Sequence, residues 1–380
     1  MLVEKLSNNI DIKKYLQELG VDSGGVSILS SKAKIHIIHI KALHVGGANI
    51  LKQDALSIGA DLAVPRGTVI AKTSEVDCIL IATTKQLKKL SQKELAQPFG
   101  LKDLAHKLKD ILSVKEALHV EIMGVINANE DSFFSGSRFK DIDAIEMIEN
   151  MIKDGASIID IGGVSSAPNS LHVEVDEELA RVKPIIDVIK KQKLYEKVKF
   201  SIDSFEPEVI RYALERGFKI VNDITGLEND EVCKLCAEFD ATAVIMHMQG
   251  KPQTMQDNPQ YDNVLSDVYN FFEQRISKAE SFGIKDIVLD VGVGFGKTLE
   301  DNLSLIKNLE HFTTLKKPLL VGASRKSMID KISPSKPENR LAGTLSLHVE
   351  ATRNGASILR VHDVYEHVQM LKVQKELKNI

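Results

Sequence analysis

Two basic motifs near the end of the chain carry the side chains with the clearest chemical potential. Ser324-Arg325-Lys326 follows a short apolar run at 318–322, and Arg360-Val361-His362 follows a second run at 357–359. Residues after such runs lie at the C-terminal mouth of a barrel of parallel strands, where active sites are built. Guanidinium and ammonium groups bind phosphate oxygens. Two neighbouring strand ends that carry such groups therefore predict a pocket for a polyanion such as pyrophosphate.

The elements that would position these groups form a regular pattern from about residue 118 to the end of the chain. Apolar runs of strand length alternate with amphipathic stretches of helix length, such as 143–152 and 175–184. Eight units in about 260 residues predict a (β/α)8 TIM barrel, which typically needs roughly 250. An open doubly wound sheet makes similar local predictions, but polar residues at nearly every strand end favour the barrel. The runs span 119–127, 157–163, 198–204, 219–225, 242–248, 287–292, 318–322 and 357–361.

Residues 1–115 have a different pattern and are assigned to a small N-terminal α/β domain of unassigned role. We predict strands at 34–40 and 78–82, a helix at 48–57 and a lysine-rich helix at 85–97. A charged helical linker at 104–115 is expected to lead into the barrel domain, residues 116–380. The fold class is therefore α/β, with the barrel as the candidate catalytic domain.

Composition restricts the class of protein. Hydrophobic residues make up 43% of the chain, charged residues 27%, and the net charge is −4. A protein needs a basic face to bind nucleic acid or a membrane surface, so neither is an expected partner. The three cysteines are too few for a disulfide framework, and no apolar run reaches the roughly 20 residues of a membrane span. A cytoplasmic protein is expected.

Several other strand ends carry groups that could bind a ligand. Asp203, Asn222 and Asp290 end three separate runs and could read a heterocycle that has both donors and acceptors, although a single strand-end Asp is usually a helix cap. Asn127 could hold Mg²⁺ together with substrate phosphates, or it could simply cap a turn. Met246 and Phe295 could form an apolar wall, and core packing is the alternative for the methionine.

Two motifs resemble known functional motifs but predict no chemistry. The loop 291–298 has the end of a phosphate-binding P-loop, but Val291 stands where its first glycine is required. We therefore interpret Gly292, Gly294 and Gly296 as a pliable loop. Cys233 and Cys236 have no second ligand pair, so they are interpreted as a pair within a helix rather than a zinc site. No Ser-His-Asp arrangement is legible.

Ten motifs occur in the order seen in dihydropteroate synthases, and the chain resembles that family over about residues 120–375. Ten ordered motifs are far more specific than any single match. The motifs are 123–127, 131–133, 160–163, 201–204, Asn222-Asp223, 246–250, Leu289-Asp290, 294–297, 324–326 and 360–363.

The resemblance implies a transferase of folate biosynthesis that joins 6-hydroxymethyl-7,8-dihydropterin diphosphate to 4-aminobenzoate, with Mg²⁺, and acts as a homodimer. By position, it implies that Asp203, Asn222, Asp290 and Lys326 hold the pterin, that Asn127 ligates Mg²⁺, and that Arg360 and His362 bind the diphosphate. We expect a dissociative substitution, in which the anionic leaving group departs before the amine attacks.

Two loops depart from the family pattern. Asn129-Glu130 replaces the usual Thr-Pro before Asp131-Ser-Phe, and Val164 to Pro168 lacks the usual Glu and Arg. Ser166 stands in the position of the family's Thr and, with Ser327, is expected to contact the aminobenzoate. The changes bear on affinity for this second substrate and on the response to sulfonamides.

Three competing interpretations remain open at this point. A related pterin-binding methyltransferase barrel would share the Asp and Asn set, but it expels no pyrophosphate and would not need the basic motifs. A pterin-binding protein without catalysis would fit the altered loops. The N-terminal domain could also serve as a partner-binding module, which deletion of residues 1–115 would test.

Overall fold

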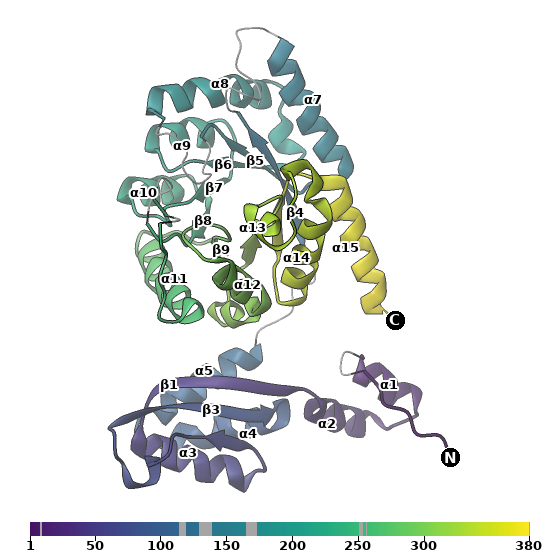
Figure 1. Cartoon of the computed structure of the whole chain (residues 1–380), viewed down its shortest axis with the longest axis vertical. Helices are drawn as coiled ribbons and strands as arrows, with labels where there is room; N and C mark the ends of the chain where they lie inside the picture. Colours follow the sequence, from purple (N-terminus) through teal and green to yellow (C-terminus); the bar gives the residue numbers. More distant parts are fainter. Residues whose placement is uncertain are drawn as a thin grey trace. The chain divides into compact units, whose positions relative to one another are not determined.

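The computed structural model describes residues 1–7, 10–113, 119–128, 139–164, 173–250, 254–255 and 257–379. The chain divides into two compact units, Met1–Lys115 and Glu116–Ile380 (Figure 1). Among the described helices, none is long and apolar enough to cross a membrane.

The second unit is a closed barrel of eight parallel strands. Each strand pairs with the next along the chain, and the last strand pairs with the first, with Arg360 level with Met123. This closure confirms the predicted TIM barrel and excludes the open sheet. The strands are β4 (Glu121–Asn127), β5 (Ile158–Gly162), β6 (Lys199–Asp203), β7 (Ile220–Asp223), β8 (Thr242–Met246), β9 (Ile287–Asp290), β10 (Leu319–Val321) and β11 (Ile358–Val361).

Helices surround this ring of strands, as Figure 1 shows. The strands are apolar because they are buried on both sides: one set of side chains fills the barrel and the other packs against the helices. The stretch predicted as a helix at 175–184 continues past Pro184 to Lys191. The helices are α7 (Phe139–Asp154), α8 (Val175–Lys191), α9 (Pro207–Leu214), α10 (Asp230–Glu238), α11 (Val264–Ser281), α12 (Leu299–Lys307), α13 (Ser327–Ile332), α14 (Leu341–Arg353) and α15 (Val364–Asn379).

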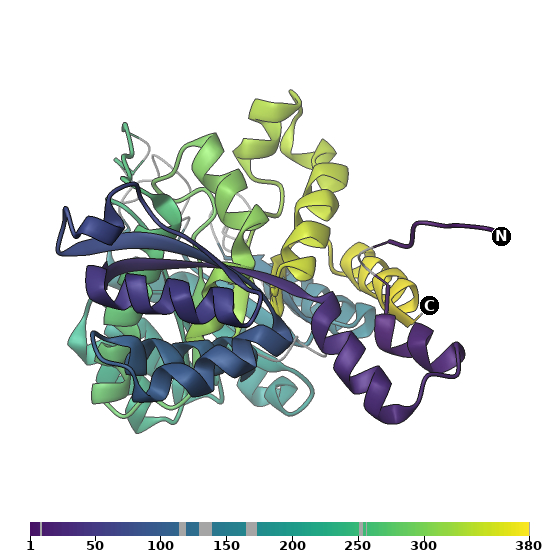
Figure 2. The ribbon, with the colours of Figure 1, turned by 90° about the horizontal axis from the view of Figure 1, so that it is seen from below.

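The first unit contains a three-stranded antiparallel sheet in the order β1-β3-β2, and α3 and α4 pack on it (Figure 2). Buried and exposed residues alternate along β3, which is typical of a sheet with one covered face. The elements are α1 (Ile12–Glu18), α2 (Ser23–Ala33), β1 (Ile35–His44), α3 (Val45–Ser57), β2 (Asp61–Ala63), β3 (Glu75–Thr83), α4 (Thr84–Lys93) and α5 (Leu101–Ser113).

The segment 104–115 was predicted to be a helical linker; its described part is helical, as predicted, but the interpretation as a linker is wrong. Its described part belongs to α5, and Leu101, Leu104 and Leu108 of this helix are buried in the core of the first unit. The density of charge along the segment suggested a solvated connection. The apolar residues at helical spacing, however, form a stripe that packs into a core.

A buried carboxyl group in the first unit predicts a pH-dependent stability. Burial, with the nearby Asp54, raises the pKa of Glu94 from 4.5 to about 7. A raised pKa stabilises the fold fully below the unfolded value, and this contribution is lost as the pH rises through 7. We expect Glu94→Gln to raise the unfolding temperature by a few degrees at pH 8 and by less at pH 5.5. Calorimetry at both pH values would measure this, with the exposed Glu75→Gln as control; equal shifts at both pH values would contradict it.

Candidate active site

An apolar layer closes the centre of the barrel and sets the position of the layer above it. The side chains of this layer are Met123, Ile158, Ile220, Val244, Val288, Leu320 and Ile358. Side chains alternate between the two faces of a strand, so the residue two positions further along each strand also points inward. The next layer toward the C-terminal ends is therefore Val125, Asp160, Asn222, Met246, Asp290, Gly322 and Arg360.

Arg360 joins the carboxylates of two other strands within this region. Its Nε donates to Asp160 Oδ2 at 2.7 Å, and its Nη2 donates to Asp203 Oδ2 at 2.5 Å. Asn222 Nδ2 donates to the same oxygen of Asp160 at 3.1 Å. Strands β5, β6, β7 and β11 are thus connected by one buried polar network, which holds three of the predicted site residues together.

Asp203 shares the Arg360 guanidinium with Asp160, and its own pKa is strongly perturbed. Burial raises the pKa of Asp203 and Arg360 lowers it, and with Asp160 and other carboxylates nearby the pKa lies at about 7. Burial lowers the pKa of Arg360, but Asp160 and Asp203 outweigh this effect and raise it. Arg360 therefore remains a cation, while Asp203 can exchange a proton near neutral pH.

Asp290 and Lys326 are two further titratable groups at the mouth, and each affects the pKa of the other. Asp290 Oδ1 accepts a hydrogen bond from the Gly292 N–H at 2.8 Å. Burial raises the pKa of Asp290, although Gly292 and Lys326 counteract it. Burial lowers the pKa of Lys326 to about 8, and Asp290 counteracts this. At neutral pH the Lys326 ammonium is charged but close to losing its proton.

An apolar wall adjoins the Lys326 ammonium. Lys326 Nζ lies 4.3 Å from the centroid of the Phe295 ring and donates to the carbonyl oxygen of Val293. Phe295 belongs to a cluster with Met246, Met255 and Ile224. A cation on an aromatic face, next to thioether side chains, provides a surface for a flat ring.

The glycine loop after β9, which the sequence predicted to be pliable, is braced by hydrogen bonds from a buried lysine. The buried Lys297 Nζ donates to the carbonyl oxygens of Gly292 at 3.0 Å and Phe295 at 2.9 Å. It also lies 2.9 Å from His247 Nδ1, which is buried as well. A Cβ at Gly292 would lie 1.9 Å from the carbonyl oxygen of His247, so only glycine fits. The brace fixes the backbone beside Asp290.

The two basic motifs contact each other directly. Ser324 Oγ lies 2.9 Å from His362 Nδ1, and Arg325 Nε donates to Asp363 Oδ2 at 3.0 Å. Burial lowers the pKa of His362 to about 4, with help from Arg360, so its imidazole is neutral at pH 7. Arg325 and Arg360 are both ion-paired. The mouth therefore holds less unpaired positive charge than the basic motifs alone suggest.

The remaining predicted residues lie at the rim or outside the described residues. Asn127 is exposed at the end of β4, level with Gly162 of β5. Ser327 is exposed at the first position of α13. Ser166 and the altered loop residues Asn129 and Glu130 lie outside the described part of the chain.

Asp160 is the site residue for which the sequence suggested no role. It is fully buried, and its Oδ1 has no hydrogen-bond partner among the described residues. One signal was available. A carboxylate inside the otherwise apolar run 158–161 requires a buried partner, and Arg360 is the basic residue at the same depth of the barrel.

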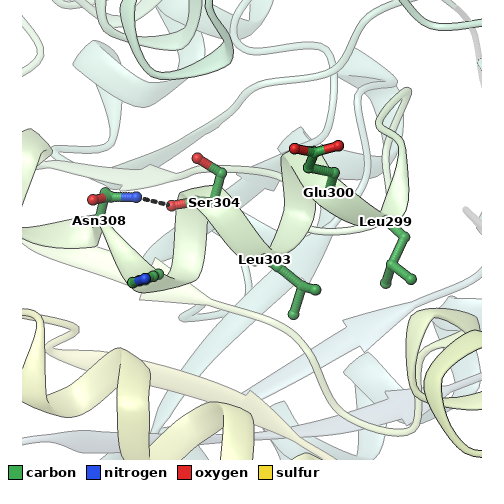
Figure 3. Close-up of a pocket in the computed structure, with 6 residues that line it drawn as sticks. Leu299, Glu300, Leu303, Ser304 and Asn308 are labelled. Carbon is green, nitrogen blue, oxygen red and sulfur yellow. Dashed lines mark hydrogen bonds between the residues drawn. The ribbon is translucent and has the colours of Figure 1, made fainter.

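A surface pocket along α12 is separate from this mouth. Figure 3 shows its lining residues, which all come from the helix itself and the residue after it, and Asn308 Nδ2 donates to the Ser304 carbonyl oxygen at 2.8 Å. None of the strand-end side chains lines this pocket. We therefore do not assign the chemistry to it.

Cys233 and Cys236 were predicted to be a pair within a helix. The structure confirms this, because both are buried members of α10.

The fold and the mouth of the barrel together define a class of protein. A (β/α)8 barrel with buried carboxylates, an amide, two cations and an apolar wall at its C-terminal mouth is an enzyme suited to a flat, polar heterocycle.

Comparison with known proteins identifies the family. The sequence pattern of the family described as pterin binding enzyme matches residues 123–362. A bifunctional dihydropteroate synthase/dihydropteroate reductase of Helicobacter pylori is 42% identical over 378 residues, covering 100% of this chain and 99% of that protein. The dihydropteroate synthase of Escherichia coli is 42% identical over 258 residues, 67% of this chain and 90% of its own.

A solved structure agrees with these sequence matches. The dihydropteroate synthase of Yersinia pestis in complex with a sulfonamide drug has a TM-score of 0.65 and 33% identity, covering 70% of this chain and 97% of its own. The chain belongs to the dihydropteroate synthase family of pterin-binding enzymes, which are transferases of folate synthesis. The resemblance found in the sequence is thereby confirmed.

Proposed function

We propose that this enzyme joins 6-hydroxymethyl-7,8-dihydropterin diphosphate to 4-aminobenzoate and releases pyrophosphate and 7,8-dihydropteroate. The observation that carries the proposal is the buried network of Asp160, Arg360, Asp203 and Asn222 beside Asp290 and Lys326. A pterin ring alternates N–H donors with nitrogen and oxygen acceptors, and this set of carboxylates, amide and cations complements that alternation.

The pterin would lie within the mouth, on the inner layer of side chains. Asp203, Asn222 and Asp290 would hold its ring nitrogens and amino group, and Lys326 would donate to its acceptors. The unpartnered Oδ1 of Asp160 could accept a further N–H from the ring. Met246 and Phe295 would cover its flat face.

The diphosphate would face the β11 loop. Arg360 donates one hydrogen bond from Nε and one from Nη2 to its two carboxylate partners. The other N–H groups of its guanidinium remain available for phosphate oxygens. His362 would contribute a neutral imidazole. Ser327 at the rim, with Ser166, would contact the aminobenzoate.

The residues present are compatible with Mg²⁺ only if the substrate supplies most of its ligands. In the described part of the chain no group of three His, Cys, Asp or Glu residues could hold a metal. The exposed Asn127 offers one neutral oxygen at the mouth, and Mg²⁺ commonly keeps waters and substrate phosphates as its other ligands. Bound there, Mg²⁺ would neutralise charge on the leaving diphosphate.

The proposed reaction is a dissociative substitution. The bond between the pterin methylene carbon and the diphosphate oxygen breaks, and its electron pair leaves with pyrophosphate. The ring and methylene then carry cationic character, which the carboxylates of Asp290 and Asp203 stabilise. The amine lone pair of aminobenzoate forms the new C–N bond, and the proton on that nitrogen passes to pyrophosphate or water. No protein nucleophile is required.

Pyrophosphate release and dihydropteroate formation, measured with and without Mg²⁺, test this proposal. We expect Lys326→Ala to lower turnover by about 100-fold or more, because it removes a preorganised charge from the site. The exposed Lys336→Ala serves as the matched control and should leave the rate unchanged. Absence of product with tight pterin binding would instead support a binding or methyl-transfer role.

A second activity is favoured by the extent of one comparison. The Helicobacter pylori relative, whose name includes dihydropteroate reductase, aligns with 100% of this chain. It therefore matches residues 1–115, which lie outside the pterin-binding match at 123–362. We propose that the full chain also reduces dihydropteroate, with a hydride donor such as NADPH or a reduced flavin.

Incubation of the full chain with dihydropteroate and each reductant would test the second activity. Formation of tetrahydropteroate by the full chain, and its loss in a chain that lacks residues 1–115 but still forms dihydropteroate, is the expected result. A full chain that forms dihydropteroate without reducing it under any of these conditions would contradict the second activity alone.

A further inference from the structure

Two buried histidines behind the mouth of the barrel are not used by the proposed chemistry. His348 lies in α14 and His367 lies in α15, and both are 0% exposed. His348 Nδ1 is 2.8 Å from His367 Nε2. A pair of polar rings in a dry interior is costly unless every nitrogen has a partner.

Both outer nitrogens of the pair reach the backbone of the active-site loops. The Ala323 N–H donates to His348 Nε2 at 3.1 Å. At the other end, His367 Nδ1 is 2.5 Å from the carbonyl oxygen of Asp363. All four ring nitrogens are therefore engaged, and the two rings connect one backbone donor to one backbone acceptor.

The two ends determine where the ring protons lie. A backbone N–H can only donate, so His348 Nε2 must accept and its proton must be on Nδ1. His348 then donates to His367 Nε2, so the proton of His367 is on Nδ1 and is donated to the Asp363 carbonyl oxygen. Each ring is neutral in this arrangement, in agreement with burial, which lowers the pKa of both histidines.

The backbone groups at the two ends belong to the loops that carry the basic motifs. Ala323 immediately precedes Ser324-Arg325-Lys326, and Asp363 immediately follows His362. The same loops are also joined by Ser324 with His362 and by Arg325 with Asp363. The histidine pair adds a third connection between them, and this one is fully buried.

We propose that His348 and His367 are positioning residues, which set the distance between the Lys326 loop and the C-terminal end of β11, where Arg360 and His362 lie. This inference rests on the proposed function, in which the first loop holds the pterin and the second holds the diphosphate. Hydrogen bonds are directional, so a chain of three defines the separation of the loops more narrowly than apolar packing does. The pair would favour a ligand that spans both loops over a pterin alone.

Paired substitutions distinguish positioning from general stability. Glutamine can accept with Oε1 and donate with Nε2, so His348→Gln and His367→Gln preserve the order of donors and acceptors. His348→Leu and His367→Leu retain apolar volume but remove the chain. Each protein is titrated with 6-hydroxymethylpterin and with its diphosphate, and KM and kcat are measured for the diphosphate substrate.

The Leu variants are expected to weaken binding of the pterin diphosphate and raise its KM by about tenfold, the effect of losing one or two buried hydrogen bonds. Affinity for 6-hydroxymethylpterin should stay within about twofold, since one loop suffices for it, and the Gln variants should recover most of the loss. Equal loss for both ligands, or Leu variants that behave like the parent, would overturn the proposal.

Failure of the underlying function would have a different signature. If the unsubstituted protein binds 6-hydroxymethylpterin and its diphosphate with equal affinity, the diphosphate group contributes nothing to binding. That result would overturn the proposed function together with this role of the histidines. If a single Leu variant does not fold, the double variant His348→Leu/His367→Leu replaces it, because two apolar side chains then face each other. The ratio of the affinity for the pterin diphosphate to the affinity for 6-hydroxymethylpterin again decides the outcome.

Discussion

Replacing Asp290 with Asn is expected to lower the rate of dihydropteroate formation by about 1,000-fold, the scale seen when one preorganised electrostatic group is lost. The amide has the shape of the carboxylate and can still accept from the Gly292 N–H, which Asp290 Oδ1 accepts at 2.8 Å. The substitution therefore removes the charge and leaves the loop in place. In a dissociative reaction that charge acts on the cationic methylene.

Steady-state kinetics with both substrates at saturation would measure this effect as a fall in kcat. Asp286→Asn is the matched control, because Asp286 is an exposed residue just before the same strand, at its opposite end. A rate within a few-fold of the parent would remove Asp290 from the mechanism, whatever its effect on pterin affinity.

Replacing Arg360 with Met is expected to destabilise the barrel by about 3–5 kcal/mol, the cost of breaking a buried ion pair by removing one partner, and to abolish activity. Asp160 is fully buried and Asp203 lies beside it, and both depend on this guanidinium. Without it, two carboxylates remain close together in the interior. Denaturant unfolding would measure the loss.

A second substitution separates the electrostatic cause from simple loss of packing. Asp203→Asn in the Arg360→Met background removes one of the two repelling carboxylates, so it should restore part of the stability without restoring activity. The exposed Arg353→Met is the control and should change stability by less than about 0.5 kcal/mol. If Asp203→Asn lowers stability further, unpaired charge is not the cause.

The sequence alone determined the architecture of the second unit. The eight apolar runs predicted the eight observed strands within a few residues, since burial on both sides requires continuous apolar strands. The ordered motifs also determined the family, because ten short matches in sequence order are specific. The positions of Asp203, Asn222 and Asp290 at strand ends followed from the same pattern.

Only the tertiary structure decided which charges meet. Arg360 pairs with Asp160 and Asp203, 200 and 157 residues away, because closure of the barrel and the register of its strands bring them to one depth. Residue type indicated that Arg325 and His362 carry positive charge, whereas the fold ion-pairs the first and neutralises the second.

The histidine chain and the role of α5 were likewise decided by the fold. His348 and His367 have no evident role in the sequence. The contact of His367 with the Asp363 carbonyl is local, but the contacts of His348 with His367 and with the Ala323 N–H exist only once α14 and α15 have packed beside the loops. Local patterns report which side chains prefer burial, because that preference depends on residue type and spacing. Charge pairing, proton position and pKa depend instead on neighbours distant in the sequence, and those neighbours exist only after the chain has closed on itself.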